Sequence, residues 1–252
     1  MKHYLIFDTE TVSLEKKYCY DIGYVIIDED GNKVLERAFI VEQVWHNIPL
    51  FSTAYYAEKR PLYVSLLKGR KAKLEKFGYI MQTMRRDIRT YGITSAYAYN
   101  SDFDDKVFAF NYEYFHCMNP FDDVEIFDIR GYAHCYVCDT IPYKKFCEEH
   151  GLYTESGNIS TTAEAVYRFV TKDTQFCEAH MALDDSRIET EILLHCHKLG
   201  AEYDKCYKVK RYIAPTEPKT VTIRYNDDTV CMGTYRSMKI SKDKSVIEIK
   251  DW

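Results

Sequence analysis

The stretch YLIFDTET, residues 4–11, decides how we interpret this sequence. Four apolar residues are followed at once by Asp8 and, two residues later, by Glu10. A short apolar run that ends in polar residues is typical of a buried strand. Because successive side chains of a strand alternate between its faces, Asp8 and Glu10 leave the strand on the same face. The stretch therefore predicts a buried strand whose C-terminal end presents two carboxylates to one site.

Two more strands follow this one along the chain. Residues 21–28 are a second apolar run and residues 33–41 are a third, with Asp30 and Gly31 in the tight turn between them. Short connections of this kind join strands that run in opposite directions. We therefore expect the first three strands to form an antiparallel meander.

Helical periods and strands alternate after this meander. Apolar residues recur at three- and four-residue steps within residues 53–91, which predicts helix there. The remaining expected elements are strands at 95–99 and 125–128, and helices at about 104–115, at 143–150, after a cap at Ser160 or Thr161, and at 180–199. This order predicts an α/β fold for residues 1–205.

Residues 206–252 have a different character. Residues 213–218 carry two prolines and are expected to link the two parts of the chain. Beyond them the sequence alternates like three strands, at 220–225, 229–235 and 245–250. This small β-rich appendage could bind substrate, add a strand to a homodimer, or cover the sheet. The sequence does not choose among these roles.

The composition is that of a globular protein, with 46% hydrophobic and 29% charged residues. No apolar run approaches the roughly 20 residues that span a bilayer, and the apolar N-terminal stretch is too short for a signal peptide. We therefore expect a cytoplasmic protein that does not contact membranes. Nine cysteines, an odd number without an export signal, are expected to be reduced thiols. The net charge of −5 requires any surface that binds nucleic acid to be a local patch.

Carboxylates stand at three places where buried elements begin or end. Asp8 and Glu10 follow the first strand, Asp104 follows the fourth, and Asp185 lies on the last long helix. Two Mg²⁺ or Mn²⁺ ions about 3.5–4 Å apart can clamp the attacking and leaving oxygens of a phosphodiester, and such hard cations prefer carboxylate ligands. His180 lies five residues before Asp185, where a neutral imidazole can accept a proton from water. The pattern favours phosphodiester hydrolysis with two metal ions.

Three motifs in this sequence resemble those of the DEDDh 3′→5′ exonuclease family, which includes proofreading exonucleases, RNase T and oligoribonuclease. They are FDTET at 7–11, NSDFD at 100–104 and HMALDD at 180–185, in the family's order and within residues 1–200. The resemblance implies the RNase H-like fold, a five-stranded mixed sheet flanked by helices. It also implies a metal-dependent exonuclease that releases nucleoside 5′-monophosphates from the 3′ end of single-stranded DNA or RNA.

The resemblance also implies roles for individual residues. Asp8, Glu10 and Asp185 would hold the first metal ion, Asp8 and Asp104 would hold the second, and His180 would be the general base. All four acids and the histidine are therefore our candidate catalytic residues. The residues that stand beside them in the motifs are assigned to substrate binding: Thr9, Thr11, Asn100 and Phe103.

The sequence departs from the family pattern in the loop after the first motif. The family often continues as D-T-E-T-T-G, whereas this chain has Ser13 in place of the glycine. Other acids stand one or two residues from Asp104 and Asp185, so the two later motifs can also be aligned on those acids. We choose Asp104 because it follows Phe103, and Asp185 because it lies five residues after His180. The acids passed over are Asp102, Asp105 and Asp184.

Each motif alone is weak, because short patterns match by accident. One alternative is a nucleic-acid-binding protein that keeps the fold without turnover. Another is a zinc-stabilised module around His134, Cys135 and Cys138, although a single C-x-x-C favours structural thiols. The basic stretch of residues 59–89 is either the solvated face of its helices or a rim that binds phosphates, with Tyr55, Tyr56, Tyr63 and Phe77 among its charges. DNA and RNA remain equal candidates as substrate.

Overall fold

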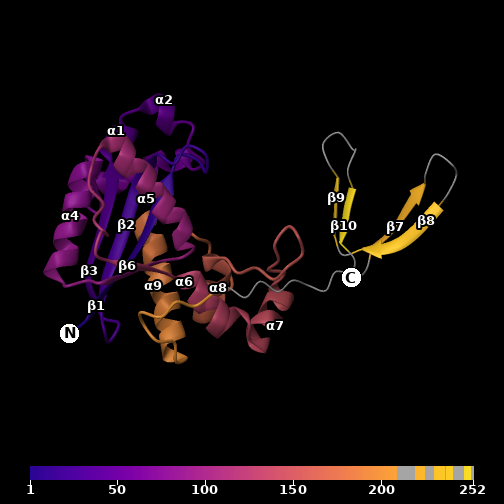
Figure 1. The fold of residues 1–252 in the computed structure, drawn as a ribbon. Coiled ribbons are helices and arrows are strands. Elements are labelled where there is room, and N and C mark those ends of the chain that lie inside the picture. Colours follow the sequence, from indigo (N-terminus) through magenta and orange to yellow (C-terminus); the bar gives the residue numbers. More distant parts are fainter. Residues whose placement is uncertain (209–218, 225–229, 236, 241–246, 251–252) are drawn as a thin grey trace. The chain divides into compact units, whose positions relative to one another are not determined.

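The structure is a computed structural model that describes residues 1–208 and, in the tail, 219–224, 230–235, 237–240 and 247–250. The chain divides into two compact units, Met1–Val209 and Lys210–Trp252, which are treated separately below (Figure 1). No helix among the described residues is long and apolar enough to span a bilayer.

The first unit is built on a mixed sheet with the strand order β4-β3-β2-β1-β5-β6. Its strands are β1 (His3–Thr11), β2 (Cys19–Asp28), β3 (Lys33–Val41), β4 (Lys73–Glu75), β5 (Ser95–Ala98) and β6 (Glu125–Asp128). β2 pairs antiparallel with β1 and with β3, so the predicted meander is confirmed. The other three pairings, β3 with β4, β1 with β5 and β5 with β6, are parallel.

The sheet has six strands, whereas the resemblance implied five. The additional strand, β4, pairs Lys73–Glu75 with Phe39–Val41 at one edge. The sequence analysis placed this segment within the helical stretch 53–91, because Leu74 continues the three- and four-residue steps of the flanking helices. A three-residue edge strand is too short to show the alternation of a strand.

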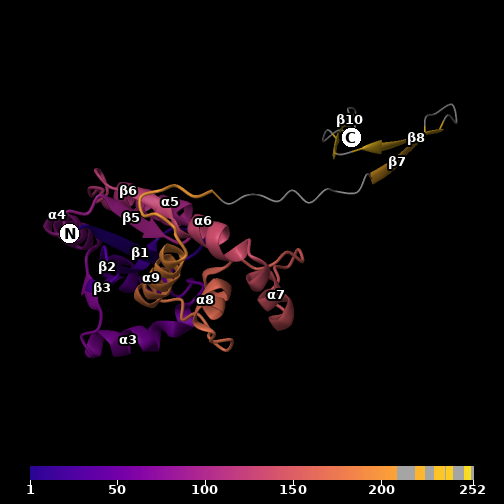
Figure 2. The same cartoon turned by 90° about the horizontal axis from the view of Figure 1, so that it is seen from below.

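Helices cover both faces of the sheet (Figures 1 and 2). The helices of this unit are α1 (Glu42–Trp45), α2 (Ile48–Phe51), η1 (Ala57–Lys59), α3 (Arg60–Lys68), α4 (Phe77–Thr90), α5 (Ser101–Phe115), α6 (Ile129–Ala133), the π-helical turn η2 (His134–Cys138), α7 (Ile141–His150), α8 (Ala163–Thr171) and α9 (Ala182–Lys198). Leu5 and Phe7 of β1 join the core that contains residues of α4 and α5. Tyr4 and Ile6 join the second core, with residues of α8 and α9. The alternation along β1 therefore directs Asp8 and Glu10 to the α9 side.

Two predicted helix starts need correction. α8 begins one or two residues later than expected, because the Thr162 side chain, rather than Ser160 or Thr161, accepts a hydrogen bond from the N–H of Ala165. α9 begins at Ala182, so His180 lies before the helix and not on its first turn. His180 has a φ of 47°, a left-handed conformation that cannot continue into a regular helix.

The described residues of the tail form two antiparallel strand pairs. β7 (Lys219–Arg224) pairs with β8 (Val230–Tyr235), and β9 (Ser237–Ile240) pairs with β10 (Ile247–Lys250). Three strands were expected here, at 220–225, 229–235 and 245–250; β9, which begins two residues after the second of them, was not predicted. The expected linker at 213–218 lies outside the described residues. The roles considered for the tail stay predictions.

Candidate active site

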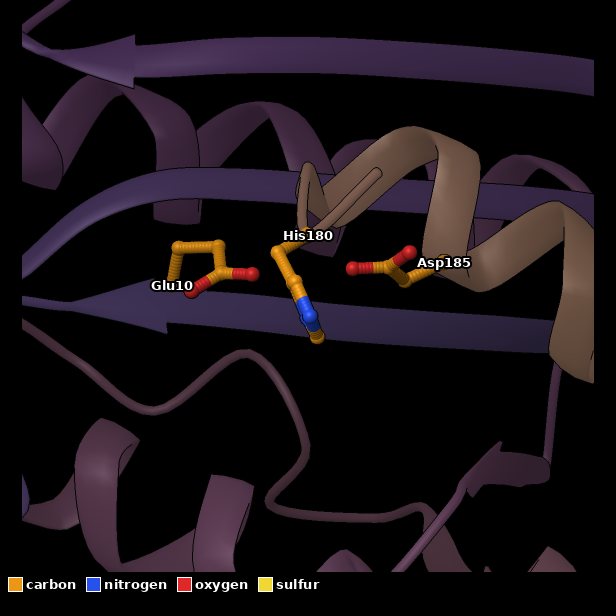
Figure 3. Close-up of side chains that lie close together, drawn as sticks. All are labelled: Glu10, His180 and Asp185. Carbon is orange, nitrogen blue, oxygen red and sulfur yellow. The ribbon is translucent and has the colours of Figure 1, made fainter. Parts of the chain in front are cut away.

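The site lies where the end of β1 meets the start of α9. Figure 3 shows the carboxylates of Glu10 and Asp185 directed toward each other from either side of the His180 side chain. One ligand atom from each of the three lies within 4.8 Å of the other two, and within the described part of the chain this is the group of side chains that could hold a metal ion. No comparable group forms around His134 and Cys138 within residues 1–208.

Contacts from β2 fix the start of α9. A Cβ atom on Gly23 would lie 2.1 Å from the backbone N of Leu183, so only glycine allows the helix to pack this closely. The Ser186 hydroxyl donates a hydrogen bond to the Gly23 carbonyl over 3.0 Å. The Asp21 carboxylate accepts hydrogen bonds from the Ala182 N–H and the Tyr63 hydroxyl. These contacts set the depth at which α9 presents its acids.

His180 is held by a stack of side chains at the mouth of the site. Its ring lies 4.6 Å from the Tyr56 ring, at an angle of 12°. The Lys59 ammonium lies 3.7 Å from the centroid of that tyrosine ring, on which a cation is attracted to the π electrons. Burial, and then the charge of Lys59, lower the pKa of His180. The imidazole is therefore neutral near pH 7, the form that can accept a proton.

Asp104 is buried beneath the end of β1, on the first turn of α5, and only 2% exposed. The Thr9 hydroxyl donates a 2.7 Å hydrogen bond to its carboxylate. The neighbouring acids face solvent, where Asp102 forms an ion pair with Lys106. Asp104 is thus buried, whereas the neighbouring acids on which the motif could also be aligned are exposed.

Burial also distinguishes Asp185 from its neighbour Asp184. Its side chain is 5% exposed and lines the central cavity. Asp184 lies nearer the surface, where its carboxylate accepts a 2.6 Å hydrogen bond from Arg187. The Oδ1 atom of Asp185 has no hydrogen-bond partner in the described part of the molecule. An ionised oxygen buried without a partner is costly unless a cation neutralises it.

The acids of the site hold protons more tightly than free carboxylic acids. Burial, together with the charges of the other acids, raises the pKa of Glu10 to about 8 and that of Asp185 to about 9. Burial raises the pKa of Asp104 to about 7, and burial with the charge of Asp104 raises the pKa of Asp8. Mg²⁺ and Mn²⁺ prefer oxygen ligands, and their positive charge offsets the repulsion between clustered carboxylates. The residues present therefore fit a divalent-metal site.

Asp8, Glu10 and Asp185 line a cavity of about 720 Å³, whereas Asp104 is not among its lining residues. Thr9, Thr11 and Phe103, which the sequence analysis assigned to substrate binding, line it. Asn100 is not among the lining residues; it is exposed, and its N–H donates to Asp128 at the entry to α5. Its backbone, with a φ of 63°, turns the chain from β5 into the helix that carries Asp104.

The structure also brings residues to the site that the sequence analysis missed. Glu178 and Glu189 line the cavity together with Tyr99. Glu189 lies four residues after Asp185, so the helical period alone could have placed it on the same face. Of the four aromatic residues considered for a nucleic-acid rim, Tyr63 and Phe77 are buried in the core, whereas Tyr55 and Tyr56 line the cavity.

The fold and the site define a mixed α/β domain with buried carboxylates at the carboxyl end of its central strand. No protein-family model matches the chain, and no curated protein matches its sequence. Solved structures of exonuclease I do match. The Escherichia coli protein in complex with a dA16 oligonucleotide is 16% identical, with a TM-score of 0.50, and 79% of this chain aligns with 41% of that chain.

Two further exonuclease I structures give the same picture. The protein from Methylocaldum szegediense is 14% identical, with a TM-score of 0.50 over 79% of this chain and 40% of that one. A product-bound exonuclease I is 15% identical, with a TM-score of 0.52 over 79% and 45%. This chain thus spans less than half the length of these proteins. The likeness confirms the predicted fold class, a mixed α/β sheet flanked by helices, which this chain shares with part of exonuclease I.

Proposed function

We propose that this protein is a metal-dependent 3′→5′ exonuclease that removes nucleoside 5′-monophosphates from single-stranded nucleic acid. The observation that carries the proposal is the convergence of Glu10, His180 and Asp185 within 4.8 Å at the edge of a cavity. The exonuclease I structures, among them one that binds a dA16 oligonucleotide, support it through their fold.

The acids and the histidine have different roles in the proposed hydrolysis. Asp8, Glu10, Asp104 and Asp185 would hold two divalent cations, which neutralise the phosphate and make a water molecule more acidic when bound. His180 accepts the proton of the attacking water, because its imidazole is neutral and lies beside the carboxylates of Glu10 and Asp185.

The cavity wall suits the end of a single strand. Tyr55, Tyr56, Tyr99 and Phe103 line it, and aromatic rings can stack on nucleobases of any sequence. Thr9 and Thr11 add hydroxyl groups to the same wall. Bases stacked here would place the terminal phosphodiester over the acids.

The test is degradation of 5′-labelled DNA and RNA oligonucleotides with Mg²⁺ or Mn²⁺. Wild-type protein should shorten the labelled strand stepwise from its 3′ end. The substitutions Asp8→Ala and Asp185→Asn should abolish this degradation. His180→Ala should slow it about 10²–10⁴-fold, the usual contribution of a general base. Asp184→Asn, a change at the surface acid next to Asp185, is the matched control and should stay active. Persistent hydrolysis in Asp8→Ala and Asp185→Asn proteins would refute the proposal.

A further inference from the structure

Glu189 is a buried carboxylate to which the proposed mechanism gives no role. It lies one turn beyond Asp185 on α9, is 3% exposed, and lines the cavity above the acids. The backbone N–H of Tyr99 donates a hydrogen bond to its carboxylate. Its Oε2 atom is buried and has no hydrogen-bond partner within the described ranges. One oxygen of Glu189 is thus left without any partner inside a cluster of acids.

The charges of neighbouring acids act on Glu189. Among nearby charges, that of Asp104 acts most strongly on Glu189, followed by that of Asp185. The charges that act most strongly on Asp8 are those of Asp104 and then of Glu189. Glu189 lines the same cavity as Asp8, Glu10 and Asp185, next to the group of Glu10, His180 and Asp185 whose ligand atoms lie within 4.8 Å of one another.

A purely structural role does not account for this arrangement. A protonated Glu189 that served as a structural hydrogen-bond donor would have a partner for its O–H, and Oε2 has none in the described part of the protein. An apolar side chain would fill the same space without the cost of burying a polar group. A bound cation would supply the missing partner for Oε2, as it would for Oδ1 of Asp185.

We propose that Glu189 is a fifth carboxylate ligand of this site and that, with Asp8 on the wall of the same cavity, it holds the second of two cations. The proposal rests on the function proposed above. Ionised, the five acids Asp8, Glu10, Asp104, Asp185 and Glu189 carry five negative charges, and two divalent cations supply four positive ones. With Glu189 as an additional protein ligand, the second cation needs no phosphate oxygen to hold it. Both cations therefore bind before nucleic acid does.

Calorimetric titration of the metal-free protein with Mn²⁺, without nucleic acid, tests this stoichiometry. Wild-type protein should bind two Mn²⁺ ions, and Glu189→Gln should bind one, or bind the second at least about ten-fold more weakly. Glutamine keeps the shape of the side chain and can still accept the hydrogen bond from Tyr99. The matched control is Glu191→Gln, because Glu191 is exposed on the same helix. This control should bind two ions.

The melting temperature of each metal-free variant separates a lost ligand from a lost fold. Glu189→Gln should melt at or above the wild-type temperature, because it removes a charge from a crowded, buried cluster. Two sites of wild-type affinity in Glu189→Gln protein, or a single site in wild-type protein, would overturn the proposal. Failure of the exonuclease function would be distinct: wild-type protein would bind two ions but leave oligonucleotides intact.

Discussion

The carboxylate of Asp21 in β2 accepts a hydrogen bond of 3.0 Å from the backbone N–H of Ala182, the first residue of α9. The first N–H groups of a helix have no partners within the helix, and a negative charge is favourable beside them. The side chain of Met181, at the N-cap, carries no oxygen that could accept such a bond. A residue of the neighbouring strand thus caps the helix that carries Asp185 and Glu189, and the position of these acids depends on the contact between β2 and α9.

Gly23→Ala should push α9 away from β2. The new Cβ would meet the backbone of Leu183, which cannot turn aside as a side chain can. We expect a loss of about 3 kcal/mol in the free energy of unfolding, the upper end for overpacking, and weaker Mn²⁺ binding. Urea denaturation and calorimetry measure the two effects. Gly78→Ala is the control, since its Cβ would lie 3.8 Å from Cys117 and should leave both quantities nearly unchanged. Equal stabilities of the two variants would contradict the packing argument.

The sequence predicted the parts of the fold that depend on local pattern. Asp8 and Glu10 were expected on one face of a strand, and β1 directs both to the α9 side because its residues alternate. Burial distinguishes Asp104 and Asp185 from their neighbours, as their spacing from Phe103 and His180 suggested. The roles of these residues stay proposals.

Other features depend on contacts that no local pattern records. The spacing of four residues places Glu189 on the face of Asp185, but its burial among the acids depends on the packing of α9 against β1. The aromatic rings of Tyr63 and Phe77 stand among basic residues in the sequence, yet they pack into the core. The left-handed backbone of His180 follows from the packing of α9, so its position before the helix could not be derived from spacing.

Metal-free protein should lose stability as the pH rises. The pKa values of Asp104, Glu10 and Asp185, about 7, 8 and 9, lie above those of unfolded carboxylic acids, near 4. The folded state therefore binds more protons, so this contribution is present below about pH 4 and is lost as the pH rises toward 9. We expect the melting temperature in EDTA to fall by at least about 4 °C from pH 6 to pH 9.

Millimolar Mg²⁺ should reverse this trend. The ions bind ionised carboxylates and stabilise the folded state by mass action, so the gain in melting temperature should grow with pH. Asp185→Asn, which removes one of the titrating groups, should show a smaller fall in EDTA and a smaller gain with Mg²⁺. A melting temperature of wild-type protein in EDTA that rises between pH 6 and pH 9 would show that the buried acids do not govern stability.

Tyr56→Ala should shift the pH dependence of hydrolysis. Burial is the largest cause of the lowered pKa of His180, and the Tyr56 ring covers one face of its imidazole. Without that ring the imidazole is better solvated, so its pKa rises and the acidic limb of the rate profile moves to higher pH. Tyr56→Phe keeps the stack and should keep the wild-type profile. The single-turnover rate of the wild type and of both variants is measured with Mg²⁺ between pH 5 and 9. Identical pH profiles for Tyr56→Ala and Tyr56→Phe would show that the Tyr56 ring does not set the pKa of His180.

Thr9→Val should raise the pH that metal binding requires. The Thr9 hydroxyl donates to Asp104 over 2.7 Å, which favours the ionised carboxylate and lowers its pKa against the effect of burial. Valine has a similar shape but no hydroxyl, so the pKa of Asp104 should rise further. The pH at which Mn²⁺ binding is half-maximal should rise with it.

Thr11→Val is the matched control for this change. Thr11 lines the same cavity, but its hydroxyl donates to the Ser13 carbonyl over 3.3 Å and not to an acid of the site. Its pH midpoint for Mn²⁺ binding, measured by calorimetry, should therefore stay at the wild-type value. An equal shift in both variants would mean that the polarity of the cavity wall sets the midpoint. A shift in Thr9→Val alone would trace it to the bond between Thr9 and Asp104, because the two substitutions remove the same group from neighbouring positions of one strand end.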